Sequence, residues 1–171
     1  MPTNTKANTR QREGAQKRRP ATEPDVMSAI EFLERDHREV EELFEQFEDL
    51  NHGAQKLEIV RRICTALTVH TTLEEEIFYP AARAATKDND LLDEAAVEHA
   101  SAKNLIAELQ AMKLGDDLYD AKVNVLGEQI KHHVREEESE LFPDCEAAGM
   151  DLDALGVQLA IRRSDLLKQA A

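Results

Sequence analysis

Apolar residues recur along most of this chain at the three- and four-residue steps typical of amphipathic helices. The pattern predicts four long helices, over about residues 25–50, 54–85, 91–112 and 116–148, and a shorter one from Leu152 to Lys168. Because short connections make consecutive helices antiparallel neighbours, we expect an all-α protein, an up-down-up-down four-helix bundle. The short C-terminal helix is expected to pack on the outside of this bundle.

Local stop signals set the expected helix ends. Asn51-His52-Gly53 ends the first helix, Gly115 closes the third and Gly149 ends the fourth. Pro80 lies inside the second helical pattern, and proline cannot donate a backbone hydrogen bond. We therefore expect Pro80 to bend the second helix or to end its regular part.

The N-terminal segment differs in composition from the rest of the chain. Residues 1–24 contain six Lys or Arg, two Glu and almost no large apolar side chain, which favours a disordered basic tail. A nucleic-acid-binding arm is the alternative, but no aromatic residue accompanies the Lys17-Arg18-Arg19 run. The expected organisation is a tail over 1–24, a bundle over 25–148 and a C-terminal helix over 149–171.

Composition narrows the class of protein. With 42% hydrophobic and 33% charged residues, 6 Gly and 5 Pro, the 171 residues suit one all-α domain with a tail. The net charge of −14 leaves −18 on residues 25–171, which argues against general nucleic-acid binding. Cys64 and Cys145 form no CxxC motif, and no segment is typical of a membrane helix or a secretory signal. We expect a soluble, cytoplasmic protein with no membrane partner.

Two copies of one motif carry the chemistry. Each has a histidine, a glutamate four residues later and a proline ten residues after the histidine, and the copies are 63 residues apart. The residues are His70, Glu74 and Pro80 in the first copy, and His133, Glu137 and Pro143 in the second. A four-residue step places an imidazole and a carboxylate on one face of a helix, an arrangement typical of metal ligands.

Two further histidines, His37 and His99, lie in the apolar stripes of the first and third helices. A single histidine in such a stripe is more often a hydrogen-bonded core residue, and a metal-free bundle with His–Glu pairs is the alternative interpretation. However, burying Glu74 and Glu137 unpaired would be costly, and no Lys or Arg occupies a matching position. The pattern therefore favours bound cations.

The residue types indicate which cations. Iron or manganese suits mixed imidazole and carboxylate ligands, and the lack of cysteine ligands argues against a structural zinc site. If both glutamates bridge two ions, the six side chains supply about eight metal bonds, fewer than the roughly ten to twelve that two ions take up. An oxo or hydroxo bridge and an exogenous ligand would fill the remainder, which indicates reactivity.

The segments around these residues resemble a known family. They are Asp36-His37, residues 70–80 (HTTLEEEIFYP), Glu98-His99 and residues 133–143 (HVREEESELFP). In this order, over residues 28–145, they are similar to the hemerythrin-like, HHE cation-binding domain. The resemblance implies a left-handed four-helix bundle that holds two iron ions without haem.

The resemblance also implies a ligand set. It has Glu74 and Glu137 bridging the irons, His37 and His70 on one iron, and His99 and His133 on the other. Oxygen-carrying members have a further histidine on the third helix, whereas the residues one turn from His99 here are Ala95 and Lys103. The missing nitrogen ligand argues against reversible oxygen carriage.

Two residues are candidates for additional metal ligands. His52 is the candidate for a histidine at the end of the first helix, although an exposed helix end is the favoured interpretation. Glu98 is the candidate for a sixth ligand. The favoured interpretation of Glu98 is a solvated carboxylate or one that contacts a ligand residue from outside the centre. Glu75 and Glu138 are candidates to orient a ligand histidine. His132 is expected to be exposed.

These features together predict a non-haem di-iron protein that reacts with or senses O2, peroxide or nitric oxide, with a small diatomic or peroxide ligand as its partner. Catalase-like peroxide decomposition or nitric oxide handling would be the reaction. One alternative is an iron- or oxygen-dependent interaction module without turnover, with the basic tail or the terminal helix as its output. Iron storage or donation is the last alternative. No separate catalytic residue is predicted, and Tyr79 is expected to serve core packing.

Overall fold

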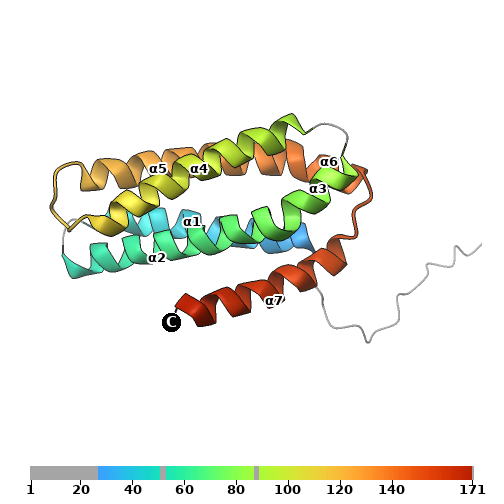
Figure 1. The fold of residues 1–171 in the computed structure, drawn as a ribbon. Coiled ribbons are helices and arrows are strands. Elements are labelled where there is room, and N and C mark those ends of the chain that lie inside the picture. Colours follow the sequence, from blue (N-terminus) through green and yellow to red (C-terminus); the bar gives the residue numbers. More distant parts are fainter. Residues whose placement is uncertain (1–26, 51–52, 87–88, 171) are drawn as a thin grey trace, which may run out of the picture.

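The computed structural model describes residues 27–50, 53–86 and 89–170, and these residues are almost entirely helical (Figure 1). The α-helices are α1 (Ala29–Asp49), α2 (Ala54–Leu73), α3 (Tyr79–Ala85), α4 (Asp90–Ala111), α5 (Tyr119–Glu136), α6 (Phe142–Ala147) and α7 (Leu152–Ala170). Two π-helical segments, η1 (Glu74–Phe78) and η2 (Glu137–Leu141), join α2 to α3 and α5 to α6 without a break.

The long helices form an antiparallel bundle. α1 packs against α2 and α5, and α4 packs against the same two helices, so α1 and α4 lie across one diagonal. Consecutive bundle helices run in opposite directions (Figure 1), which confirms the predicted all-α, up-down-up-down topology. Among the described residues, no helix is both long and apolar enough to cross a membrane.

The start of α1 is set by a capping box. The Glu31 backbone N–H donates to Ser28 Oγ at 3.3 Å, and the Ser28 N–H donates to Glu31 Oε2 at 2.9 Å. The helix therefore begins at Ala29, a few residues after the predicted start near Asp25. The basic tail predicted over residues 1–24 lies outside the described residues.

The connection between α4 and α5 differs from the prediction. α4 ends at Ala111, so Gly115 does not close it. Instead, the Lys113 N–H donates to Asp116 Oδ2 at 2.8 Å, and Gly115 and Leu118 adopt positive φ angles of 92° and 69°. This side-chain hydrogen bond stabilises a turn in place of another helical turn. Consequently, the fourth bundle helix begins at Tyr119 rather than at residue 116.

Gly149 ends the fourth bundle helix as predicted. It has a φ of 73°, which glycine adopts at no steric cost. Its N–H donates to the Glu146 carbonyl at 3.0 Å, and the Met150 N–H reaches back to the Cys145 carbonyl at 3.4 Å. These bonds satisfy carbonyls at the helix end and turn the chain toward α7.

Pro80 marks an irregularity rather than an end of the second bundle helix. The helix continues to Ala85, and the π-helical segment η1 precedes the proline. The Tyr79 N–H donates to the carbonyl of Glu74, five residues back. η2 lies in the same position before Pro143. Each motif thus contains a π-helical turn that begins at its glutamate, a feature that is frequent at functional sites.

The core consists of two apolar regions with a polar layer between them. One region contains Leu43 and Ile63, and the other contains Leu33 and Phe78. Six buried polar side chains separate the regions along the bundle: His37, His70, Glu74, His99, His133 and Glu137. The polar layer therefore lies between the two apolar regions, and each of α1, α2, α4 and α5 contributes one histidine to it.

One large aromatic side chain of α1 lies at the edge of the core. Phe44 is only half-buried, and Leu43 beside it is fully packed in the core. Phe44 lies over Gly127 of α5, where a Cβ atom would come within 3.1 Å of the Phe44 ring. The absence of a side chain at Gly127 thus leaves room for this ring at the edge of the bundle.

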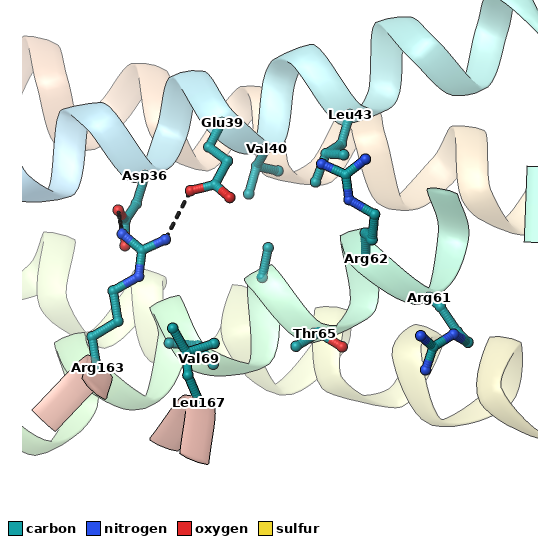
Figure 2. A pocket seen from close by; sticks show the side chains of 11 residues that line it. Asp36, Glu39, Val40, Leu43, Arg61, Arg62, Thr65, Val69, Arg163 and Leu167 are labelled. Carbon is teal, nitrogen blue, oxygen red and sulfur yellow. Dashed lines mark hydrogen bonds and ion pairs between the residues drawn. The ribbon is translucent and has the colours of Figure 1, made fainter. Parts of the chain in front are cut away.

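α7 packs across α1 and α2, as predicted for the terminal helix (Figure 1). Leu159 is fully buried, and a Cβ atom on Gly156 would lie 2.1 Å from the Met27 carbonyl oxygen. A groove of about 320 Å³ runs between the three helices (Figure 2). At one end of the groove, Arg163 donates to Asp36 at 2.6 Å and to Glu39 at 2.8 Å.

Candidate metal centre

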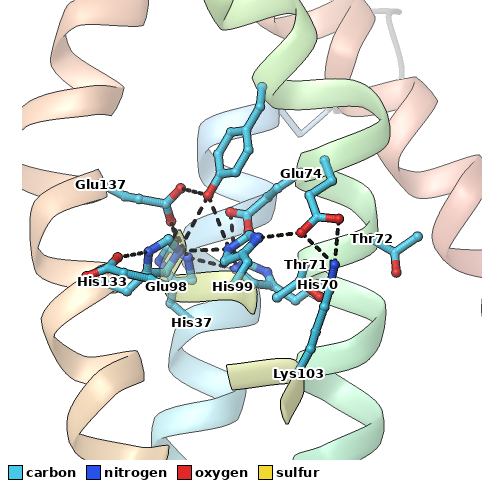
Figure 3. A network of polar contacts seen from close by, with 12 residues as sticks. His37, His70, Thr71, Thr72, Glu74, Glu98, His99, Lys103, His133 and Glu137 are labelled. Atoms are coloured by element: carbon cyan, nitrogen blue, oxygen red, sulfur yellow. Dashed lines mark hydrogen bonds and ion pairs between the residues drawn. The ribbon is translucent and has the colours of Figure 1, made fainter. Parts of the chain in front are cut away.

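Six side chains from the bundle helices converge in the polar layer (Figure 3). They are His37 from α1, His70 from α2, Glu74 from η1, His99 from α4, His133 from α5 and Glu137 from η2. The Nε2 atoms of His37 and His70 are 3.2 Å apart, as are those of His99 and His133. Because a metal–imidazole bond is about 2.1 Å long, each pair has the spacing of two imidazoles on one ion.

Glu74 lies between the two histidine pairs. Its Oε1 is 3.2 Å from His70 Nε2, and its Oε2 is 3.3 Å from His99 Nε2. Each oxygen therefore faces a different pair, as a bridging carboxylate requires. In the polar layer, the potential ligand atoms form two groups, and all atoms of a group lie within 4.8 Å of one another. Glu74 belongs to both groups.

Glu137 is arranged differently. Its Oε2 is 3.3 Å from His37 Nε2 and 3.5 Å from His133 Nε2, so one oxygen faces both histidine pairs. Its Oε1 accepts a hydrogen bond from the Tyr79 hydroxyl at 2.8 Å. The two glutamates thus differ in how many oxygens they leave for a bound ion.

Three of the four oxygens of the buried carboxylates have no hydrogen-bond partner within the described part of the chain. Glu74 is 0% exposed and Glu137 is 2% exposed. Among the described residues, both oxygens of Glu74 and Oε2 of Glu137 make no hydrogen bond, although imidazole nitrogens lie 3.2–3.5 Å away. Burying such oxygens unpaired is costly. Cations placed between the nitrogens and the oxygens would compensate, so the residues fit a metal centre.

The electrostatics of this layer favour positive charge. Burial alone would raise the pKa of the Glu74 carboxyl, but the facing imidazoles hold it well below its usual value. Burial alone would lower the pKa of His37, but contacts with Glu137 and Glu138 raise it to about 10. The layer therefore takes up either protons or metal ions, and metal binding must displace the protons from the ligand nitrogens.

Three outer carboxylates contact the Nδ1 atoms of central histidines. The Nδ1–oxygen distances are 2.9 Å for His37 and Glu138, 3.0 Å for His99 and Glu75, and 2.8 Å for His133 and Glu98. Such contacts orient the rings so that Nε2 faces the centre, and they make a metal-bound imidazole more basic. The buried Nδ1 of His70 has no hydrogen-bond partner within the described part of the chain.

Two of these outer carboxylates have a cationic partner. Arg38 pairs with Glu138, and Lys103 Nζ lies 2.6 Å from both carboxylate oxygens of Glu75. Lys103 lies one turn after His99 on α4, and its ammonium extends outward to this carboxylate. It therefore supplies no ligand to the centre.

Tyr79 belongs to the centre, and the helical pattern of the sequence missed it. Its hydroxyl is 3.3 Å from His99 Nε2 and 3.5 Å from His133 Nε2, in addition to its bond with Glu137. Tyr79 follows Glu74 by five residues, and on an α-helix of 3.6 residues per turn this step points away from the glutamate. The π-helical turn of η1 brings the side chain back to the same face. A tyrosine directly before the motif proline was the available signal.

The Tyr79 phenol is a neutral donor. Burial raises its pKa well above the usual value, and the charges of Glu74 and Glu137 raise it further. A group that keeps its proton can donate a hydrogen bond to Glu137 or to a molecule bound beside it. The centre thus combines six candidate ligands with one fixed O–H donor.

The remaining predicted residues have separate outcomes. His52 lies outside the described residues, so its role stays a prediction. Glu98 contacts His133 Nδ1 from the outer side and does not reach the centre. The His132 side chain is 57% exposed, as expected. The assignment of the six central residues as ligands stays a prediction, which their convergence supports.

Comparison with known proteins relates this geometry to a family. The chain matches the hemerythrin HHE cation binding domain over residues 28–145. Its fold is similar to the crystal structure of a hemerythrin HHE cation binding domain-containing protein from Mycobacterium kansasii, with a TM-score of 0.72 over 84% of this chain and 89% of that chain. The sequence identity of that pair is 23%, so this likeness concerns the fold.

A DNA nickase of Nostoc sp. is 29% identical to this chain over 116 residues, which cover 68% of this chain and 33% of the nickase. The chain therefore spans about a third of the length of that relative. The family match, in contrast, includes every helix that contributes to the polar layer. The chain belongs to the hemerythrin HHE cation-binding family, and it is a metal-binding helical bundle.

Proposed function

We propose that the polar layer holds two iron ions and that the protein reacts with a small oxidant, with peroxide as the first substrate to test. The observation that carries this proposal is the set of three buried carboxylate oxygens without hydrogen-bond partners, which face two pairs of imidazole nitrogens. His37 and His70 would hold one ion, and His99 and His133 the other. Glu74 and Glu137 would bridge them.

Iron would supply Lewis acidity and reversible electron transfer, which suit peroxide, dioxygen and nitric oxide. The chain would contribute positioning and protons. Glu138, Glu75 and Glu98 fix three imidazoles through their Nδ1 atoms. The two apolar regions on either side keep bulk water from the layer, which strengthens its electrostatic interactions.

The Tyr79 hydroxyl would define the side on which a small molecule binds. It lies 3.3 Å from His99 Nε2 and donates a hydrogen bond to Glu137. A small oxidant on this side would accept a hydrogen bond from the same hydroxyl. No second donor of this kind occurs among the central residues of the described chain, because Phe142 occupies the corresponding place in the second motif.

Metal analysis and peroxide turnover test this proposal together. Protein produced with iron should contain close to two irons per chain, turn yellow on exposure to oxygen and consume peroxide. His133→Ala should lower the iron content and abolish turnover with the helical content retained. Lys131→Ala, which changes an exposed residue of the same helix, is the matched control. Less than one iron per chain, or undiminished turnover in His133→Ala, would contradict the proposal.

A second candidate function is an iron-dependent interaction module with α7 as its output. The observation that favours it is that two arginines of α7 form ion pairs with residues close in sequence to candidate ligands. Arg162 donates to Glu76 of η1 at 2.7 Å, and Arg163 donates at 2.6 Å to Asp36, the neighbour of His37. Hydrogen exchange in α7, measured with and without iron, tests it: exchange that does not depend on iron excludes α7 as the output.

We do not expect this chain to have the DNA-nicking activity that is named for the Nostoc relative. The chain spans only a third of that protein, and its net charge of −14 repels a phosphate backbone. Incubation of the iron-loaded protein with supercoiled plasmid checks this point, and we expect no conversion to the nicked form.

A further inference from the structure

A second group of metal-ligand side chains lies at the surface, beside the candidate centre. It consists of Glu98 on α4 and His132 and Glu136 on α5, and we call it the surface triad. His132 Nε2 lies 3.3 Å from Glu136 Oε1 and 3.7 Å from Glu98 Oε1. The His132 side chain is 57% exposed, that of Glu98 is 26% exposed and that of Glu136 is 30% exposed, so solvent reaches all three.

The charge balance of the surface triad differs from that of the other outer carboxylates. Glu138 and Glu75 are neutralised by Arg38 and Lys103. Glu98 forms no ion pair with a Lys or Arg among the described residues, and neither does Glu136. Within the described chain, the two carboxylates thus have only the imidazoles of His132 and His133 beside them, and a cation would balance the negative charge that remains.

A narrow crevice leads inward from two members of the surface triad, Glu98 and Glu136. Glu98 and Glu136 line it together with the deeply buried His133 and Glu137, and apolar side chains form its walls. Its volume is about 10 Å³, close to the room for one water molecule. The exposed residues therefore mark its mouth, and the central residues mark its floor.

Glu137, which lines the crevice, carries an unsatisfied acceptor that faces the candidate ligands His37 and His133. Glu137 Oε2 is buried, lies in the layer of candidate ligands and makes no hydrogen bond among the described residues. Glu98 connects the two levels, because its Oε2 contacts His133 Nδ1 at 2.8 Å while its Oε1 faces His132. An ion held at the mouth would therefore be one carboxylate away from a ligand of the centre.

We propose that the surface triad is a loading site that captures a divalent first-row cation, ferrous iron in the cell, and passes it through the crevice to the His133 and Glu137 side of the centre. This inference rests on the proposed function only in that the centre receives iron. Mixed imidazole and carboxylate donors suit such ions, and three exposed ligands bind weakly enough to release them. The excess negative charge would also raise the local concentration of the cation.

Iron-loading kinetics test the proposal. Metal-free protein is mixed with limiting ferrous iron in the presence of oxygen, and the absorbance of the oxidised iron centre is followed. His132→Ala and Glu136→Gln should each load at least fivefold more slowly and reach the same final iron content. Glu128→Gln, which removes an exposed charge from the same helix outside the surface triad, is the control and should load at the wild-type rate.

Manganese binding provides a second measurement. Iron-loaded wild-type protein, whose centre is filled, should bind one further Mn²⁺ that is detectable by electron paramagnetic resonance. This binding should be lost in His132→Ala and kept in Glu128→Gln. The loading site would be overturned by variant loading rates within twofold of the control, or by Mn²⁺ binding that persists in His132→Ala. In that case, two irons per chain in the wild-type protein would still support the proposed function. A wild-type chain that takes up no iron would overturn both.

Discussion

Tyr79 and Phe142 occupy equivalent positions in the two motifs, five residues after Glu74 and Glu137 respectively, but only Tyr79 brings a polar group to the centre. The Tyr79 hydroxyl donates to Glu137 at 2.8 Å, across the bundle from its own motif. The Phe142 ring stacks on His37 with centroids 5.9 Å apart and planes 6° from parallel. The repeated motif therefore builds a centre with one polar side and one apolar side.

Removal of the hydroxyl should separate its role from that of the ring. Tyr79→Phe keeps the packing and deletes the bond to Glu137, so the free energy of unfolding should fall by about 1 kcal/mol. We expect unchanged iron content, a shifted absorbance of the oxidised centre and at least tenfold lower peroxide turnover. Tyr119→Phe, at another buried tyrosine far from the centre, is the control. Equal turnover in the two variants would remove Tyr79 from the reaction.

Glu74 should matter more to metal content than any single histidine. Its oxygens face both histidine pairs, whereas each imidazole belongs to one pair. Glu74→Ala should therefore reduce iron from two ions per chain to one or none, and His70→Ala should leave about one. Elemental analysis after gel filtration measures this difference, with Glu75→Ala as a control that changes only an outer carboxylate. Two irons per chain in Glu74→Ala would rule out its role as a bridge.

The metal-free protein should become less stable as pH rises. Burial would lower the pKa of His133, but the charges of Glu137 and Glu98 raise it to about 9, and that of His37 is raised to about 10. The ordinary value of 6.5 applies to the unfolded chain. The folded state thus binds more protons between pH 6.5 and 9, so this stabilisation is complete below that window and is lost on crossing it.

Denaturant unfolding of the metal-free protein at several pH values within that window measures this loss. The iron-loaded protein is the comparison, because metal-bound imidazoles carry no extra proton and their stabilisation should not fall over the same window. A free energy of unfolding that stays constant from pH 6.5 to 9 in the metal-free protein would show that these two histidines are not protonated in the folded state.

The contact of α7 with the start of α1 should be sensitive to one methyl group. Gly156→Ala would place a Cβ atom 2.1 Å from the Met27 carbonyl oxygen, a backbone atom that cannot move aside freely. We expect a loss of about 1–3 kcal/mol and faster proteolysis within α7. Gly127→Ala is the matched control, because the nearest atoms to its Cβ would belong to the movable Phe44 ring, at 3.1 Å, and alanine has a higher helix propensity than glycine. Similar melting temperatures for the two variants would contradict the close contact of α7 with α1.

The family, the fold and the convergence of the six central residues were all accessible from the sequence. Apolar periodicity gave the bundle helices, and the His-x-x-x-Glu spacing placed an imidazole and a carboxylate on one face of a helix. The helix ends were less accessible, because a side-chain hydrogen bond at Asp116 and a capping box at Ser28 decided them. Each of these hydrogen bonds replaces a helical one at a single position, and apolar periodicity carries no information about such bonds.

The sequence alone determined that histidines and glutamates face the interior, because they lie in the apolar stripes of the helices. It also determined that a positive charge must accompany them, since burial of an unpaired glutamate is strongly unfavourable. Only the tertiary structure decided how those residues meet. The π-helical turns at Glu74 and Glu137 rotate the following residues, so Tyr79 joins the centre although an α-helical projection points it away. The partners of the outer nitrogens, and the crevice lined by Glu98 and Glu136, depend on contacts between helices, which no spacing within one helix specifies.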